Sequence, residues 1–160
     1  MDAPSHLLID GSNILHAWPE LRAMLKGDRA AARARLAAAA RALHDAEHIR
    51  VSVVFDGRGP EVVVENPAGQ ASFALITAPA GMTADDLIEQ IVGKARSPRS
   101  CLVATDDRAE RQTIEALGAA GMSASDLAAW VARSAERQGE RLARRRQANE
   151  KEWRRHGPRA

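Results

Sequence analysis

Short apolar segments alternate with longer segments of helical composition along this chain. The three most apolar runs, HLLID (6–10), IRVSVVFD (49–56) and SCLVAT (100–105), are typical of strands buried inside a sheet. EVVVE (61–65) and SFALIT (72–77) are two shorter strand candidates. The expected helices are at residues 28–47, 83–95, 107–119 and 123–138. This alternation predicts an α/β fold with a mainly parallel sheet and helices on both of its faces.

Aspartates stand where the three most apolar strands end. Asp10 closes the first strand and Asp56 the second, while Asp106 and Asp107 follow the third. The carboxyl ends of parallel strands meet at one edge of a sheet, which is where open α/β folds place their ligands. Because neighbouring strands lie about 4.8 Å apart, we expect these carboxylates to converge.

A further acidic position, Asp85, lies in the first turn of a helix for which Thr83 is the expected cap. Each acid taken alone has a simpler explanation. Asp10 and Asp56 precede glycine, as residues in turns do. Asp85 and Asp107 would each interact favourably with the dipole at the start of a helix. Turn and helix chemistry does not, however, require an aspartate at three strand ends at once, so we treat the acids as a candidate site.

Carboxylates that converge repel one another, by about 1 kcal/mol per pair at a separation of 4 Å even in bulk water. Protonation of one member relieves the repulsion, and a bound divalent cation is the other solution. Oxygen ligands without a suitably spaced histidine or cysteine favour Mg²⁺ or Mn²⁺ over zinc. A cation of this kind suits phosphoryl chemistry, because it can activate a water for attack and stabilise the leaving oxygen.

Length and composition narrow the class of protein. A chain of 160 residues is expected to form one domain. Its single cysteine, Cys101, excludes an internal disulfide framework and is consistent with a reducing compartment. The first residues, MDAPSH, lack the features of a signal peptide, and no apolar run approaches the roughly 20 residues of a membrane span. We therefore expect a cytoplasmic protein that does not enter a membrane.

Charge is unevenly distributed along the chain. Residues 133–160 contain ten lysines and arginines against four glutamates, a net charge of +6, whereas the preceding 132 residues carry −4. A basic C-terminal segment of this kind could bind a polyanion such as RNA. The alternative is a helix whose charges are only solvated. Only five residues are aromatic, which argues against a module that recognises bases by stacking. The expected division is a folded domain at 1–138 followed by a basic helix or tail at 139–160.

Five motifs occur in an order and spacing that resemble one family. They are the Asp10-Gly-Ser-Asn13 loop, VVFDG, TADDLIEQ, VATDDRAER and GMSASDLAAWV. Together they resemble the YacP-like branch of the NYN-domain ribonucleases, in the PIN-like nuclease superfamily, over about residues 5 to 150. The resemblance implies a three-layer α/β/α sandwich with a mainly parallel sheet, and a metal-dependent endoribonuclease activity.

The same resemblance implies roles for individual residues. One or two Mg²⁺ or Mn²⁺ ions would be held by four acids: Asp10, Asp56, Asp85 and Asp107. Asn13, in the loop after the first strand, would position the metal or the phosphate.

Two positions depart from the family pattern. Ser12 replaces an aromatic residue, so any stacking by that side chain is lost. Asp106 replaces the serine of a Thr-Ser-Asp sequence and adds a carboxylate that could displace Asp107 as metal ligand; of the two we favour Asp107. Ser12 and Thr105 are candidates to hydrogen-bond a phosphate or a metal-bound water, and both could equally be turn hydroxyls.

The expected activity is hydrolysis of single-stranded RNA, with mRNA in a ribosome-associated setting as one candidate substrate. The arginine cluster of the tail, Arg144, Arg145 and Arg146, would hold flanking phosphates or ribosomal RNA. One alternative is a non-catalytic RNA- or ribosome-binding protein. A small-molecule phosphatase or a phospho-acceptor domain is a weaker alternative. The former needs an acid at position 12, which is a serine here, and the latter needs a lysine after its last strand, where none is suitably placed. A DNA nuclease is the remaining alternative. The family resemblance favours RNA, since metal and carboxylates alone do not distinguish the sugar.

Overall fold

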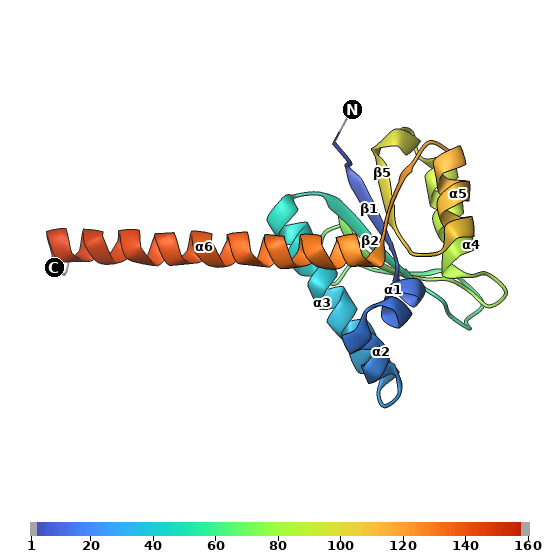
Figure 1. Ribbon diagram of the computed structural model, residues 1–160, viewed down its shortest axis with the longest axis horizontal. Helices are drawn as coiled ribbons and strands as arrows, with labels where there is room; N and C mark the ends of the chain where they lie inside the picture. The colour runs from blue at the N-terminus through green and yellow to red at the C-terminus, as the bar shows by residue number, and fades with distance from the viewer. Residues whose placement is uncertain (1–2, 158–160) are drawn as a thin grey trace.

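A six-stranded sheet lies between two layers of helices in the computed structural model, which describes residues 3–157 (Figure 1). The strands are β1 (His6–Asp10), β2 (Arg50–Phe55), β3 (Val63–Glu65), β4 (Phe73–Thr77), β5 (Cys101–Ala104) and β6 (Ala120–Met122). Their order in the sheet is β3-β4-β2-β1-β5-β6, and every pairing is parallel except that of β3 with β4. The predicted α/β class and mainly parallel sheet are confirmed.

The helices divide between the two faces of the sheet. One face is covered by α1 (Gly11–Ala17), α2 (Pro19–Leu25), α3 (Arg29–Glu47) and α6 (Ala124–His156). The other face is covered by α4 (Ala84–Lys94) and α5 (Arg108–Ala116). A short 3₁₀ turn, η1 (Pro98–Ser100), precedes β5. The sandwich therefore has the three layers that the family resemblance implies.

Two short helices and one strand were not predicted. The helices α1 and α2 are separated by Trp18, which stays extended because it precedes a proline, while Pro19 starts α2 at a position where its missing N–H costs nothing. The strand β6 has only three residues, one of them a glycine, and lacks an apolar run. It becomes a strand because its backbone pairs with β5.

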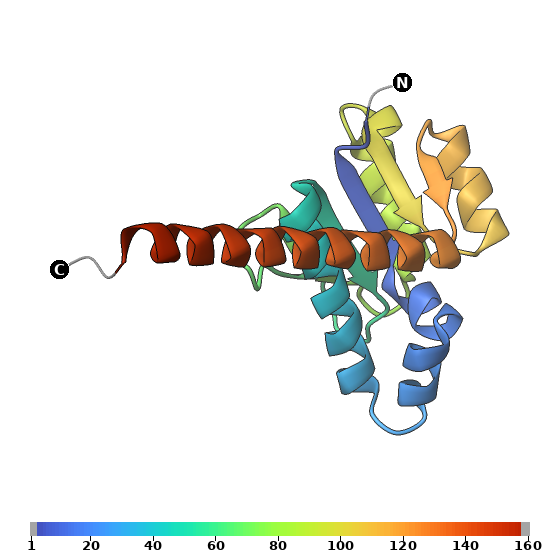
Figure 2. The ribbon, with the colours of Figure 1, turned by 60° about the vertical axis from the view of Figure 1, so that its left-hand side comes forward.

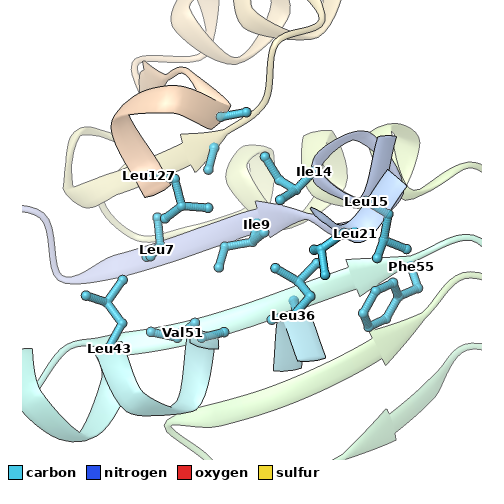
Figure 3. Close-up of a cluster of buried hydrophobic side chains, with 14 of the residues drawn as sticks. Leu7, Ile9, Ile14, Leu15, Leu21, Leu36, Leu43, Val51, Phe55 and Leu127 are labelled. Atoms are coloured by element: carbon cyan, nitrogen blue, oxygen red, sulfur yellow. The ribbon is translucent and has the colours of Figure 1, made fainter. Parts of the chain in front are cut away.

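Alternation along β1 explains why the central strands are apolar on both sides. Leu7 and Ile9 face a core that α3 and α6 complete, with Leu36 and Leu127 among its members (Figure 3). Leu8 faces the opposite core, beneath α4 and α5. A strand buried on both faces requires hydrophobic residues at every position, so its first polar residue falls where the strand leaves the core.

Helix α6 leaves the body of the molecule and extends well beyond it (Figure 2). Its first half packs on the core through Leu127, and Arg137 pairs with Glu47 of α3. From residue 141 to residue 156 every side chain is exposed. The expected boundary between residues 138 and 139 lies inside this continuous helix, near the point where it leaves the body.

Some expectations concern residues that the structure does not describe. The last three residues of the expected tail, 158–160, and the first two of the MDAPSH segment lie outside the described residues. Within residues 3–157, no helix combines the length and the apolar character needed to cross a bilayer.

Candidate active site

The site is built where three neighbouring strands end. Asp10 is the last residue of β1, Asp56 follows β2, and Asp106 and Asp107 follow β5 by two and three residues. The strand order places β1 between β2 and β5, so all three ends lie at one edge of the sheet. Asp10 is 5% exposed and accepts a hydrogen bond from the Asn13 N–H through Oδ1 at 3.1 Å, which makes it the cap of α1.

Gly11 lets the chain turn tightly against β2 after Asp10. A Cβ atom at this position would lie 2.6 Å from the Phe55 ring and 2.9 Å from the Val54 carbonyl oxygen. The Asp-Gly pair is therefore required by close packing as well as by turn chemistry.

Three carboxylates approach each other closely beside Asp10. Oxygen atoms of Asp85, Asp107 and Glu110, hereafter the acidic cluster, lie within 4.8 Å of one another. Among the described residues, none donates a hydrogen bond to Asp85 Oδ1 or Glu110 Oε1, although both oxygens are buried. Buried carboxylate oxygens without a donor fit a cation, because a cation replaces the missing hydrogen bonds. The acidic cluster is therefore a group of residues that could hold a metal ion.

Glu110 was not predicted as a site residue. It lies in the first turn of α5, its side chain is fully buried, and Thr105 Oγ1 donates to its Oε2 at 2.8 Å. The sequence does carry a signal: Glu110 precedes Ile114 by one helical turn and so falls on the buried side of α5. Because Asp107 is the cap of this helix, a glutamate three residues later resembles an ordinary feature of a helix start.

Asp56 and Asp106 lie at the same edge but each has a different partner. Asp56 Oδ1 accepts from the Ala84 N–H at 2.7 Å, at the start of α4. Asp106 Oδ1 accepts from the Ala124 N–H at 2.8 Å, at the start of α6. Each of these two aspartates thus binds a helix terminus, and Asp107 rather than Asp106 joins the acidic cluster.

Three polar side chains that were expected at the site connect its loops. Asn13 Oδ1 accepts from the Asp106 N–H at 2.9 Å, and Ser12 Oγ accepts from the Asp56 N–H at 3.1 Å. Thr105 Oγ1 accepts from the Asp107 N–H at 3.1 Å while donating to Glu110. Ser12 and Asn13 therefore hold the end of β1 to the ends of both neighbouring strands.

The predicted arginine cluster is located elsewhere. Arg144, Arg145 and Arg146 lie on the exposed half of α6, which points away from the sheet (Figure 2). The structure does not bring these arginines to the strand ends.

The family model for the YacP-like NYN domain matches residues 7–157. The chain belongs to this family. Two crystal structures of Rae1 (YacP) from Bacillus subtilis are similar to this NYN domain, each with a TM-score of 0.70 and each covered over 84% of its own chain. One is 29% identical over 94% of this chain, and the other, a W164L mutant, is 28% identical over 90%. No curated protein matches the chain. The predicted family is confirmed, and it supports a nuclease-type function related to RNA.

Burial and mutual repulsion raise the pKa of several carboxyl groups in this NYN domain. Burial, followed by the neighbouring Asp10 carboxyl group, raises the pKa of Glu110 to about 10. Burial, with Glu89 nearby, raises the pKa of Asp85 to about 7. The pKa of Asp10 is raised as well, mainly by burial. Since metal ligands must be deprotonated, binding of a cation would release protons from these groups.

Proposed function

We propose that this protein is a metal-dependent endoribonuclease that hydrolyses phosphodiester bonds of single-stranded RNA. The observation that carries the proposal is the pair of buried carboxylate oxygens, Asp85 Oδ1 and Glu110 Oε1, which receive no hydrogen bond within the described part of the chain. Mg²⁺ or Mn²⁺ fits this site because its donors are all carboxylate oxygens. Asp85, Asp107 and Glu110 would hold the ion, with Asp10 at the border of the acidic cluster.

Held by these residues, a divalent cation would act as a Lewis acid toward the phosphate and would lower the pKa of a bound water. Residues of the chain set the geometry around it. Thr105 fixes Oε2 of Glu110, which leaves Oε1 free to serve as a ligand. Asn13 anchors the loop after β5 by binding the Asp106 N–H, so that the next residue, Asp107, is held at the start of α5. Asp56 acts as a positioning residue, because its Oδ1 binds the start of the helix that carries Asp85.

Exposed arginines on α6 support RNA as the partner. Arg144, Arg145 and Arg146 present positive charge on a helix that extends beyond the body, where phosphates of mRNA or ribosomal RNA can reach it. The same feature favours a second candidate function, a non-catalytic RNA- or ribosome-binding protein on this scaffold. The two candidates differ in whether RNA is cleaved.

A cleavage assay separates these candidates. The purified protein is incubated with end-labelled single-stranded RNA, with Mg²⁺, Mn²⁺ or a chelator, and with DNA of the same sequence in parallel. We expect internal cleavage of RNA that requires the cation. Asp10→Asn should abolish it while keeping the fold, because asparagine also caps α1. Asp86→Asn is the matched control, since Asp86 caps the start of α4 outside the acidic cluster.

Each outcome of the assay has a defined meaning. RNA binding without cleavage under any of the cation conditions would favour the non-catalytic function. Cleavage of DNA at the same rate would remove the preference for RNA. Cleavage of an mRNA only after addition of ribosomes would assign the activity to the ribosome-associated setting.

A further inference from the structure

A pocket of about 660 Å³ lies beside Asp56. It is lined by Arg29, Arg33, Asp56, Gly57, Arg58 and Thr77. Its volume is in the range of sites that hold small molecules or single nucleotide units. Three arginines against one aspartate give the pocket an excess of positive charge, at an edge of the sheet where the other candidate residues are acidic.

Arg33 is held in place from two directions. Its guanidinium carbon lies 5.1 Å from the centre of the Phe55 ring, and its Nη2 donates to the Asp56 carbonyl oxygen at 3.1 Å. Its Nε is buried, and no hydrogen-bond acceptor for it occurs within residues 3–157. A planar guanidinium that is stacked on an aromatic ring and lines a pocket has further N–H donors suited to a phosphate, which offers several acceptor oxygens.

Asp56 connects this arginine pocket to the acidic cluster. Its carbonyl oxygen binds Arg33, and its Oδ1 binds the N–H of Ala84, the residue before Asp85. Asp10 pairs with Val54 in the parallel β1–β2 register, so Asp56 lies only two residues beyond the partner of Asp10. A phosphodiester chain that passes the acidic cluster can therefore reach the arginines.

We propose that Arg29, Arg33 and Arg58 bind a backbone phosphate of the RNA next to the one that is cleaved. The inference rests on the proposed function and adds to it the contact that holds the substrate. An acidic cluster by itself repels a polyanion, so a fixed cationic site beside it is needed to set the register of the strand. Arg29 and Arg58 are exposed and supply charge, while Arg33 supplies directed hydrogen bonds.

Binding of a fluorescent single-stranded RNA oligomer tests the proposal. The 160-residue chain carries Asp10→Asn so that RNA is not cut, and fluorescence anisotropy is recorded in Mg²⁺ over a range of salt. We expect Arg29→Gln with Arg58→Gln to weaken binding about tenfold. The slope of log affinity against log salt should fall by up to about 0.7, because the variant loses the contact to one phosphate of a single strand.

A matched control is available on the same helix. Arg41 is exposed and lies 12 residues beyond Arg29, roughly 18 Å along α3. Arg41→Gln removes one positive charge, half of what the double variant loses, and should change affinity less than twofold. Arg33→Lys should bind more tightly than Arg33→Gln but more weakly than the parent, because lysine keeps the charge and loses the planar fork. Thermal unfolding of each variant shows whether it is folded.

The outcomes distinguish this proposal from the proposed function. If the Arg29/Arg58 double variant binds as the Arg41 control does, the phosphate site is refuted, even where wild-type protein cleaves RNA. If binding depends on these arginines and wild-type protein cleaves nothing, the phosphate site stands and the nuclease assignment fails. A third outcome is that calorimetry detects binding of inorganic phosphate to the pocket while the arginine substitutions leave the affinity for RNA unchanged. In that case the site binds a free anion, and the RNA contact is refuted.

Discussion

Thr105 Oγ1 donates a 2.8 Å hydrogen bond to Glu110 Oε2, and both side chains are completely inaccessible to solvent. This bond joins the end of β5 to the first turn of α5 and fixes the carboxyl group of Glu110. It occupies one oxygen of Glu110, whereas the other, Oε1, receives no hydrogen bond from any described residue. The pair therefore fixes the orientation of the Glu110 carboxyl group next to that of Asp10.

Replacing Glu110 with glutamine should stabilise the protein in the absence of metal. The pKa of Glu110 is about 10 in the folded chain, against a reference value of 4.5. The folded state thus keeps a proton that the unfolded state releases, and the contribution of this group to stability falls as pH rises from about 4.5 to 10. Glutamine is neutral throughout, so at pH 8 we expect Glu110→Gln to be more stable by about 1 kcal/mol or more.

Urea denaturation at pH 5 and pH 8 in a chelator measures the Glu110 effect. The gain should be larger at pH 8. Glu115→Gln, at an exposed position of the same helix, should show no comparable gain. A Glu110→Gln variant that is no more stable than wild type at pH 8 would contradict the buried, protonated carboxyl group.

Divalent cations should stabilise the fold through the acidic cluster. A ligand that binds only the folded state adds about 2.7 kcal/mol at a concentration 100 times its Kd, so Mg²⁺ or Mn²⁺ should raise the Tm of the wild type. Asp85→Asn should require about tenfold more cation, or more, for the same rise, as metal sites commonly do after loss of a supporting group. Asp86→Asn changes the adjacent residue and conserves a cap, so its response should equal that of wild type. Equal responses of all three proteins would exclude Asp85 from the site.

Adjacent aspartates after β5 should have opposite phenotypes. Asp106→Ala removes the acceptor for the Ala124 N–H and should cost about 1 kcal/mol of stability, while leaving the cation-induced rise in Tm unchanged. Asp107→Asn keeps a side chain that can cap α5 and should weaken the cation response with little loss of stability. Thermal unfolding with and without Mn²⁺ measures both effects. The reverse pattern would mean that Asp106 is the ligand.

The sequence was sufficient to predict which edge of the sheet carries the acids. Asp10 ends a strand that is buried on both faces, and parallel pairing brings the ends of such strands together. That prediction depends on local sequence and on a general rule of α/β folds. Which of Asp106 and Asp107 joins the acidic cluster could not be predicted in this way. It depends on where the start of α6 lies, because the Ala124 N–H at that start binds Asp106.

Features formed by distant segments were not predictable in the same way. Glu110 matches a helix-start pattern, and its burial follows from how α5 packs on the sheet. The arginine pocket combines Arg29 and Arg33, one helical turn apart on α3, with Arg58 of the loop after β2. Nothing in the sequence indicates that Arg58 joins the other two. Backbone pairing with β5, rather than local propensity, also makes β6 a strand.

His6 should make the fold sensitive to mild acid. Its Nε2 lies 2.8 Å from Ser52 Oγ across the β1–β2 pair, and burial, followed by the charge of Arg50, lowers its pKa from 6.5 to about 4. Between these pH values His6 is protonated in the unfolded chain and neutral in the folded chain. The free energy of unfolding therefore decreases as pH falls from about 6.5 towards 4. His6→Gln should lose less stability over this range than wild type, as measured by urea midpoints at pH 7 and pH 4.5. His16→Gln, at an exposed position, should lose as much as wild type.

Arginines on the projecting half of α6 should contribute to RNA binding without contributing to the fold. Arg144, Arg145 and Arg146 are exposed, so replacing all three with alanine should leave the Tm of the body unchanged. If they contact phosphates, the slope of log affinity against log salt for single-stranded RNA should fall by up to about 2. An unchanged slope would support the alternative, a helix that is only solvated.

The same segment offers a matched control for the arginine variant. Replacing three glutamates, Glu140, Glu150 and Glu152, with alanine makes the same number of changes on the exposed part of α6 and gives a similar gain in helix propensity. This control should bind RNA as tightly as wild type or more tightly, because it removes negative charge. Weaker binding by both triple variants would indicate that the shape of the helix matters and that its charge does not.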